Sequence, residues 1–140
     1  PAQAATWKAD VLISLHCNAA GAGVRGVEAF RTPPVGARST YATQRVTASS
    51  PNNRWDADNA RLAFELQRGA VAATGATDRG TKHARFAVIK ESPVPAVLLE
   101  MGFLSHPTEE SNLGSAAYQT QLATGIANGV DRYAAAVRQP

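Results

Sequence analysis

Two side chains that can take part in acid–base or metal chemistry stand at the ends of runs of apolar and small residues. His16 follows the run at residues 11–15, and Glu100 follows the run at residues 96–99. An ionisable group at the end of a buried strand is costly unless a partner or a ligand engages it. A neutral imidazole is a common zinc ligand, and a nearby carboxylate can take the proton from zinc-bound water. The pair fits metal-assisted hydrolysis, although a histidine at a strand end is also common as a structural residue.

The pattern of apolar residues predicts the elements that must hold this pair. We expect strands at 10–16, 24–30, about 86–89 and 96–99, and helices at 4–8, 56–73 (stopped by Gly75) and 118–133. The first and last of these strands show no polar alternation, which is typical of strands buried on both faces, whereas 24–30 alternates and should be half-buried. Such strands with helices between them predict an α/β fold with a mostly parallel sheet. Ligands bind beyond the carboxyl ends of such strands, where His16 and Glu100 both lie.

Size and composition limit the classes of protein. The 140 residues fit a single domain, and the net charge of +3, with no cluster of Lys and Arg, does not favour a nucleic-acid partner. No apolar run is long enough to cross a membrane, so we expect no membrane insertion. The single cysteine, Cys17, excludes an internal disulfide and is interpreted as a small buried hydrophobe. Residues 31–54 lack any periodicity and are predicted to form a surface loop of unusual length, functional or mobile.

Several segments together resemble one enzyme family. "SLHCNA" contains His16, "GVEAF" contains Glu28, and "LLEMGFLS" contains Glu100. They occur in this order along the chain and are followed by the helical segment "YQTQLATGIANGVDRY". The chain is similar to the zinc-dependent N-acetylmuramoyl-L-alanine amidases, the amidase_3 family. The first and third of these motifs are the specific ones.

The resemblance implies roles for two residues. His16 matches the histidine of the family's Ser-x-His-x-Asn motif and would be a Zn²⁺ ligand, and Glu100 matches the glutamate that the family uses as catalytic acid/base. The family fold is a three-layer α/β sandwich, a mixed, largely parallel sheet with helices on both faces. The implied reaction is hydrolysis of the amide between N-acetylmuramic acid and L-alanine in peptidoglycan. The expected partner is therefore a muramyl peptide, and the expected location is extracytoplasmic. We also expect the protein to be monomeric.

The chain also departs from the family pattern. Family members supply two further zinc ligands, a histidine and a glutamate, upstream of the motif that contains His16, where this sequence has only fifteen residues. We therefore expect residues 1–140 to form part of an amidase catalytic domain without its N-terminal segment, and to bind zinc poorly. Replacement ligands would have to come from Glu28, His83 or His106; otherwise His83 should be solvent-facing.

Other residues and other functions remain open at this stage. Asn18 is expected to hold the loop of His16 by a hydrogen bond. Arg79 and Lys82 are interpreted as solvated loop charges or as contacts for the carboxylates of the stem peptide. One alternative function is a catalytically inactive peptidoglycan-binding or regulatory domain. Another is a glycosidase that uses Glu28 and Glu100 as its carboxylate pair.

Overall fold

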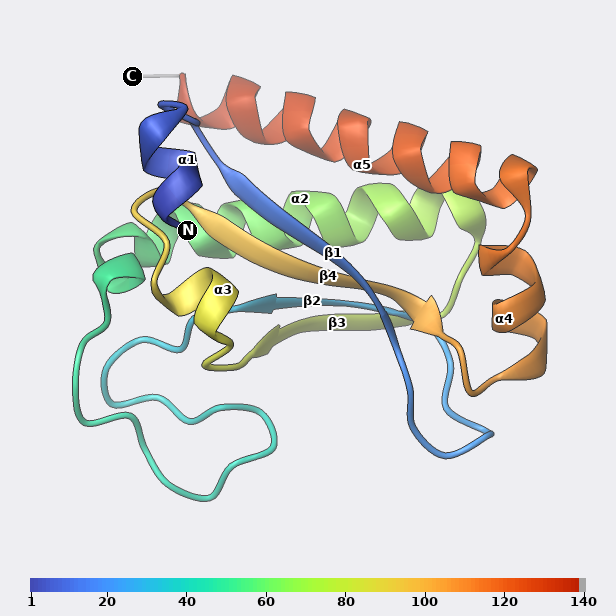
Figure 1. Cartoon of the computed structure of the whole chain (residues 1–140), viewed down its shortest axis with the longest axis horizontal. Helices are drawn as coiled ribbons and strands as arrows, with labels where there is room; N and C mark the ends of the chain where they lie inside the picture. The colour runs from blue at the N-terminus through green and yellow to red at the C-terminus, as the bar shows by residue number, and fades with distance from the viewer. Residues whose placement is uncertain (139–140) are drawn as a thin grey trace.

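A four-stranded sheet forms the centre of the computed structural model, which describes residues 1–138 (Figure 1). Its order is β1-β4-β2-β3, with the bounds β1 (Leu12–Asn18), β2 (Val27–Arg31), β3 (Asp78–His83) and β4 (Ala96–Phe103). β1 pairs with β4 and β2 with β3 in parallel, whereas β2 and β4 run antiparallel. The sheet is mixed and largely parallel, as expected.

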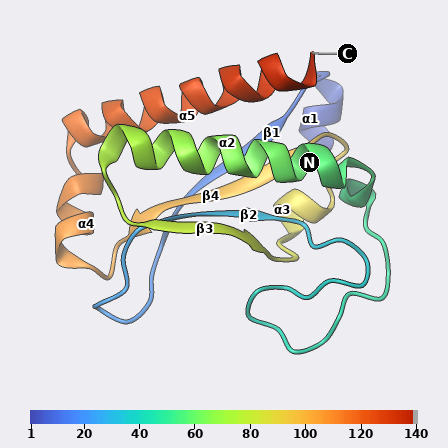
Figure 2. The same ribbon diagram turned by 180° about the vertical axis from the view of Figure 1, so that it is seen from behind.

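Helices lie on both faces of this sheet. The long helices α2 (Asp56–Thr74) and α5 (Ala116–Val137) run side by side over one face, and the single-turn α3 (Ala87–Lys90) lies on the other (Figures 1 and 2). The remaining helices are short: α1 (Ala2–Thr6), the 3-10 helix η1 (Pro51–Trp55) and α4 (Pro107–Leu113). The predicted α/β class is confirmed. Within residues 1–138 no helix is both long enough and apolar enough to cross a membrane.

The two faces of the sheet carry two separate apolar clusters, because successive side chains of a strand point to opposite faces. The larger cluster lies under α2 and α5 and includes Val27, Ala29, Val97, Leu99, Leu62 and Leu66. The smaller one lies under α3 and is formed by Phe30, Ile89, Ala96 and Leu98. Phe86 packs edge-on against Phe30, with ring centroids 5.3 Å apart. The smaller cluster leaves room on its face for polar side chains.

Small residues bring α2 and α5 into close contact. A Cβ added to Gly125 would lie 2.8 Å from the Cβ of Ala73 and would also meet the backbone of Gly69. At Gly129 it would lie 2.7 Å from the carbonyl oxygen of Glu65. α2 ends where predicted, because Gly75 adopts the left-handed conformation (φ 68°) that stops a helix.

Two predictions of strand burial are wrong. β1 pairs only with β4 among the described residues and is an edge strand, so Leu15 is 50% exposed rather than buried on both faces. β2 lies between β4 and β3, and Val27, Ala29 and Phe30 are all buried rather than half-exposed. The position of a strand within the sheet, which the local pattern does not reveal, decides both outcomes. β4 is buried on both faces, as predicted.

The assignment between residues 78 and 90 is also wrong. The expected strand at 86–89 is helix α3, whose Ile89 is fully buried, and the segment expected to be a loop contains β3. β3 is a polar sequence, "DRGTKH", that pairs with β2 through its backbone at the edge of the sheet. It has no apolar alternation by which it could be found.

The long loop between β2 and η1 is irregular, as predicted. Its backbone carries one isolated bridge, between Arg38 and Arg45, and Thr40 in its middle is hydrogen-bonded to His83 at the end of β3. It passes on the α3 side of the sheet (Figure 1).

Candidate active site

Three ionisable side chains form a row across β1, β4 and β2. His16 is the register partner of Glu100, and Glu100 is the register partner of Glu28. Each lies an even number of residues from a strand residue packed in the smaller apolar cluster, so all three project from the face opposite α2 and α5. The prediction that His16 and Glu100 lie side by side is confirmed, but both lie within their strands rather than at the carboxyl ends, because β1 continues to Asn18 and β4 to Phe103. Glu28 lies near the start of β2. Because β2 runs antiparallel to β4, the start of β2 lies beside Glu100.

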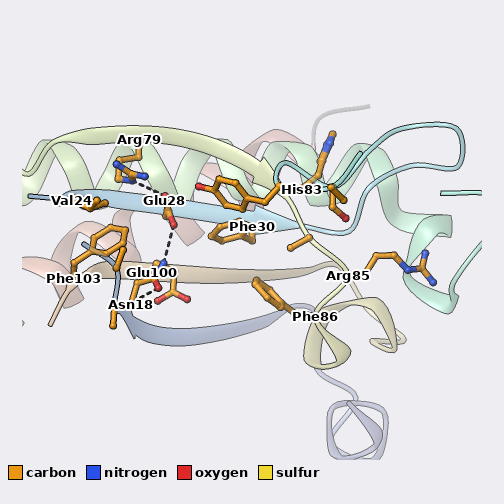
Figure 3. A pocket seen from close by; sticks show the side chains of 16 residues that line it. Asn18, Val24, Glu28, Phe30, Arg79, His83, Arg85, Phe86, Glu100 and Phe103 are labelled. Atoms are coloured by element: carbon orange, nitrogen blue, oxygen red, sulfur yellow. Dashed lines mark hydrogen bonds and ion pairs between the residues drawn. The ribbon is translucent and has the colours of Figure 1, made fainter. Parts of the chain in front are cut away.

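Glu28 is a buried and fully engaged carboxylate, only 1% exposed. Its Oε1 accepts a hydrogen bond from Asn18 Nδ2 at 3.0 Å, and its Oε2 pairs with Arg79 Nε at 2.7 Å and with Lys82 Nζ (Figure 3). Burial by itself raises the pKa of Glu28, but the hydrogen bonds and charges of Lys82 and Arg79 outweigh it and lower that pKa below its usual value. Glu28 is thus held ionised.

The surroundings of Glu100 differ from those of Glu28. It is 8% exposed, and its Oε2 is buried without a hydrogen-bond partner among the described residues. Burial raises the pKa of Glu100, and the charge of Glu28 raises it further, although His16 acts against both. One carboxylate of the row is therefore a fixed anion, and the other has an oxygen free to exchange a proton.

His16 is exposed, and its Nε2 lies 3.0 Å from the hydroxyl of Ser14. No three His, Cys, Asp or Glu side chains of residues 1–138 are grouped so that they could hold a metal ion. A catalytic zinc needs three protein ligands. The side chains around His16 therefore do not fit a complete zinc centre.

The candidate replacement ligands lie apart from one another. His83 ends β3 and is half-buried rather than solvent-facing; burial, together with the charge of Arg31, lowers its pKa. His106 precedes α4 and lines a different pocket, beside Glu109. Cys17 is exposed, so its interpretation as a buried hydrophobe is wrong, because β1 is an edge strand.

Asn18 and the two basic residues differ from their expected surroundings. Asn18 is the last residue of β1; its Oδ1 accepts the N–H of Ala19 at 2.8 Å at the start of the following loop, and its amide N–H donates to Glu28. Arg79 and Lys82 lie on β3, not in a loop, and both pair with Glu28. Both cations are paired within the protein rather than solvated.

A pocket of about 760 Å³ opens beside this row. Its wall contains Glu28 and Glu100 toward one end and His83 and Arg85 at the other, with Phe30 and Phe86 between them and Phe103 beyond the two glutamates (Figure 3). Tyr41 and Ser39 of the long loop also line it. This loop has no apolar periodicity, and its unusual length, interpreted as a sign of a functional or mobile loop, was the one indication of its place in the pocket.

Glu109 is a second residue that sequence reasoning missed. It is 7% exposed, and its two carboxylate oxygens accept the backbone N–H groups of Gly26 and Phe103, each at 2.8 Å. These donors lie close in sequence to Glu28 and Glu100 respectively. Glu109 therefore ties the start of β2 to the end of β4. Its place in the motif-bearing stretch "GFLSHPTEE" was the only signal.

Comparison with known proteins identifies the family. The family model described as N-acetylmuramoyl-L-alanine amidase matches residues 1–132. The chain belongs to the N-acetylmuramoyl-L-alanine amidase family. It is 33% identical over 131 residues to the amidase LytC of Bacillus subtilis (strain 168), covering 94% of this chain and 23% of LytC.

Solved amidase structures share the fold. The chain superposes on the N-acetylmuramoyl-L-alanine amidase from Clostridium difficile 630 with a TM-score of 0.75 and 34% identity. It superposes on the catalytic domain of the amidase CwlV from Bacillus (Paenibacillus) polymyxa var. colistinus with a TM-score of 0.73 and 31% identity. Each match covers 95% of this amidase-family chain and 62% of the solved chain. The chain thus spans less than two thirds of the relatives it matches.

Proposed function

We propose that this chain carries the hydrolytic chemistry of a peptidoglycan amidase, acting outside the cytoplasm on the bond between N-acetylmuramic acid and L-alanine. The observation that carries the proposal is the free oxygen of Glu100, a buried carboxylate on the wall of an open pocket. The family membership supports the substrate class. The pairing of Glu28 with Glu100 supports different roles for the two carboxylates, with Glu28 remaining ionised and Glu100 exchanging a proton.

Glu100 is the proposed catalytic acid/base. An amide is cleaved when water attacks its carbonyl, and the nitrogen must be protonated before it can leave. Glu100 takes the proton from the attacking water and then gives it to the departing nitrogen of L-alanine. A pKa raised by burial suits both transfers, because the group must hold the proton between them. Glu28 stays ionised and keeps Arg79 and Lys82 in place.

Zn²⁺ is the proposed cofactor, and His16 is the ligand that this chain would supply to it. One imidazole does not make a three-ligand site, so no step of the mechanism above depends on the metal. We expect zinc to bind weakly: after dialysis in metal-free buffer, elemental analysis should find well below one zinc per chain. A value of one would show that the described residues complete the site.

The test is digestion of purified peptidoglycan in buffers of increasing zinc concentration. New amino termini of L-alanine should appear, because the cleaved bond is an amide, and Glu100→Gln should lower their rate of appearance by about 10²- to 10⁴-fold. The exposed Glu110→Gln is the matched control and should keep the parent rate.

Three results would contradict the proposal. New reducing ends that still form when a chelator is present would indicate a glycosidase. Binding of muropeptides with no release of stem peptide at any zinc concentration would indicate a binding domain. Full activity of Glu100→Gln, with an unchanged circular dichroism spectrum, would remove Glu100 from the mechanism.

A further inference from the structure

Tyr41 is an exposed aromatic residue on the wall of the pocket that contains Glu100. It lies in the long loop between β2 and η1, and it is 73% exposed. A large ring left open to solvent beside a candidate active site is available for a ligand, because aromatic side chains with a polar tip bind well at wet interfaces.

The position of the ring is fixed by bonds from β3. Lys82 Nζ donates a hydrogen bond to the Tyr41 hydroxyl at 2.6 Å, and the same ammonium lies 5.1 Å from the centre of the ring. The adjacent residue, Thr40, donates its N–H to the carbonyl of His83 at 2.8 Å, and its hydroxyl oxygen accepts the N–H of His83 at 2.9 Å. Tyr41 is therefore presented by a loop anchored to the sheet, and a ligand would not bear the whole cost of ordering it.

The cation nearest to the ring is already engaged within the protein. Lys82, the cation nearest to the ring, is already paired with Glu28, and Glu28 also holds Arg79. A carboxylate of a stem peptide would compete with Glu28 for Lys82, and the cation left to it lies at the other end of the pocket, at Arg85. Ser39 and Ala42 continue the wall of the pocket. This combination of an apolar ring face with hydroxyl groups matches a sugar ring, which has an apolar face of C–H groups and a polar rim.

The spacing also fits the substrate proposed above. Glu100, Glu28 and Lys82 lie on the neighbouring strands β4, β2 and β3, so about 10 Å separates the strand of Glu100 from that of Lys82. The muramic acid ring is joined to the cleaved amide through its short lactyl group. With the amide at Glu100, a muramic acid ring turned toward β3 would lie beside Tyr41.

We propose that Tyr41 is a platform on which a sugar ring of the glycan strand packs, so that this site selects amides attached to a sugar. The inference rests on the proposed function for the identity of the sugar. The packing contact is made by the face of the phenol ring, while the hydroxyl keeps its bond to Lys82.

Binding of the peptide-free disaccharide of N-acetylglucosamine and N-acetylmuramic acid, followed by NMR titration, tests the platform without turnover. The parent protein should bind it, and Tyr41→Ala should weaken binding at least tenfold. Tyr41→Phe should stay within about threefold of the parent, since it keeps the ring. Trp7→Ala, which removes another exposed aromatic residue (70% exposed) that does not line the pocket, should bind like the parent.

Failure of this inference differs from failure of the proposed function. No disaccharide binding by the parent, or equal binding by Tyr41→Ala, would overturn the platform. So would loss of stem-peptide binding in Tyr41→Ala with disaccharide binding retained. A parent protein that binds the disaccharide through Tyr41 but never cleaves peptidoglycan would refute the proposed function and leave the platform standing.

Discussion

Glu28 and Glu100 are register partners on neighbouring strands, yet their surroundings move their pKa values in opposite directions. Two cations and an amide surround Glu28, whereas Glu100 keeps one buried oxygen unpaired. Titratable groups whose environments separate their pKa values are typical of acid–base sites. The same contrast disfavours a glycosidase pair, because both oxygens of Glu28 are already bonded within the protein and its pKa is lowered.

Glu109 is the residue whose removal should loosen this arrangement. Glu109→Gln replaces one acceptor oxygen by a donor that faces a backbone N–H, so one of the bonds to Gly26 and Phe103 is lost within the protein. We expect the free energy of unfolding to fall by roughly 1–3 kcal/mol, the usual cost of an unsatisfied buried group. Urea titration measures this change in the free energy of unfolding. The neighbouring exposed Glu110→Gln is the control, and equal stability of the two variants would contradict the role given to Glu109.

Packing of whole elements depends most on the contact between α2 and α5. Gly125→Ala should destabilise the protein by about 1–3 kcal/mol, because the new methyl group would meet the backbone of Gly69 and the Cβ of Ala73. This cost exceeds the gain in helix propensity, which is about 1 kcal/mol at most.

Gly114→Ala is the matched control for that prediction. Gly114 has ordinary helical dihedral angles (φ −76°), and an added Cβ would approach its neighbours no closer than 3.5 Å. This variant should be as stable as the parent or slightly more stable. Thermal unfolding of both variants measures the difference, and a Gly125→Ala protein that melts with the parent would show that the helices can move apart without cost.

At the scale of the whole molecule, buried carboxylates set the response to acid. Glu65, 1% exposed on α2, pairs with Arg132 of α5 at 2.8 Å and with Arg61 at 2.9 Å. Burial raises the pKa of Glu65, but these arginines, with Arg68, outweigh it and lower the pKa below its usual value. The folded protein therefore holds this proton less tightly than the unfolded chain does. The resulting stability is present above about pH 4.3 and is lost as pH falls through the folded pKa.

Glu65→Gln should consequently be less stable than the parent at pH 7, with a difference in unfolding free energy that shrinks as pH falls below about 4. Denaturant titrations at a series of pH values measure it. The pKa of Glu100 is raised, so that group contributes with the opposite sign; comparing Glu65→Gln with the parent cancels it. A difference that stays constant down to pH 3 would show that the arginines do not stabilise the ionised form.

The sequence by itself determined the long amphipathic elements and the chemistry-bearing motifs. α2 and its Gly75 stop, most of α5, and the buried β4 follow from local patterns of apolar residues, which need no knowledge of distant neighbours. The rule for parallel strands predicted that His16 and Glu100 lie side by side toward one end of the sheet. The family followed from the motifs around these two residues.

Only the tertiary structure decided what depends on contacts between segments far apart in the chain. β3 exists because its backbone pairs with β2, so a polar sequence becomes a strand, and Arg79 and Lys82 are thereby brought to Glu28. The exposure of β1 depends on its place at the edge of the sheet. Tyr41 joins the pocket through bonds to β3 that no local pattern encodes. Burial and pairing are properties of the assembled sheet, and they separate the free carboxylate of Glu100 from the engaged one of Glu28.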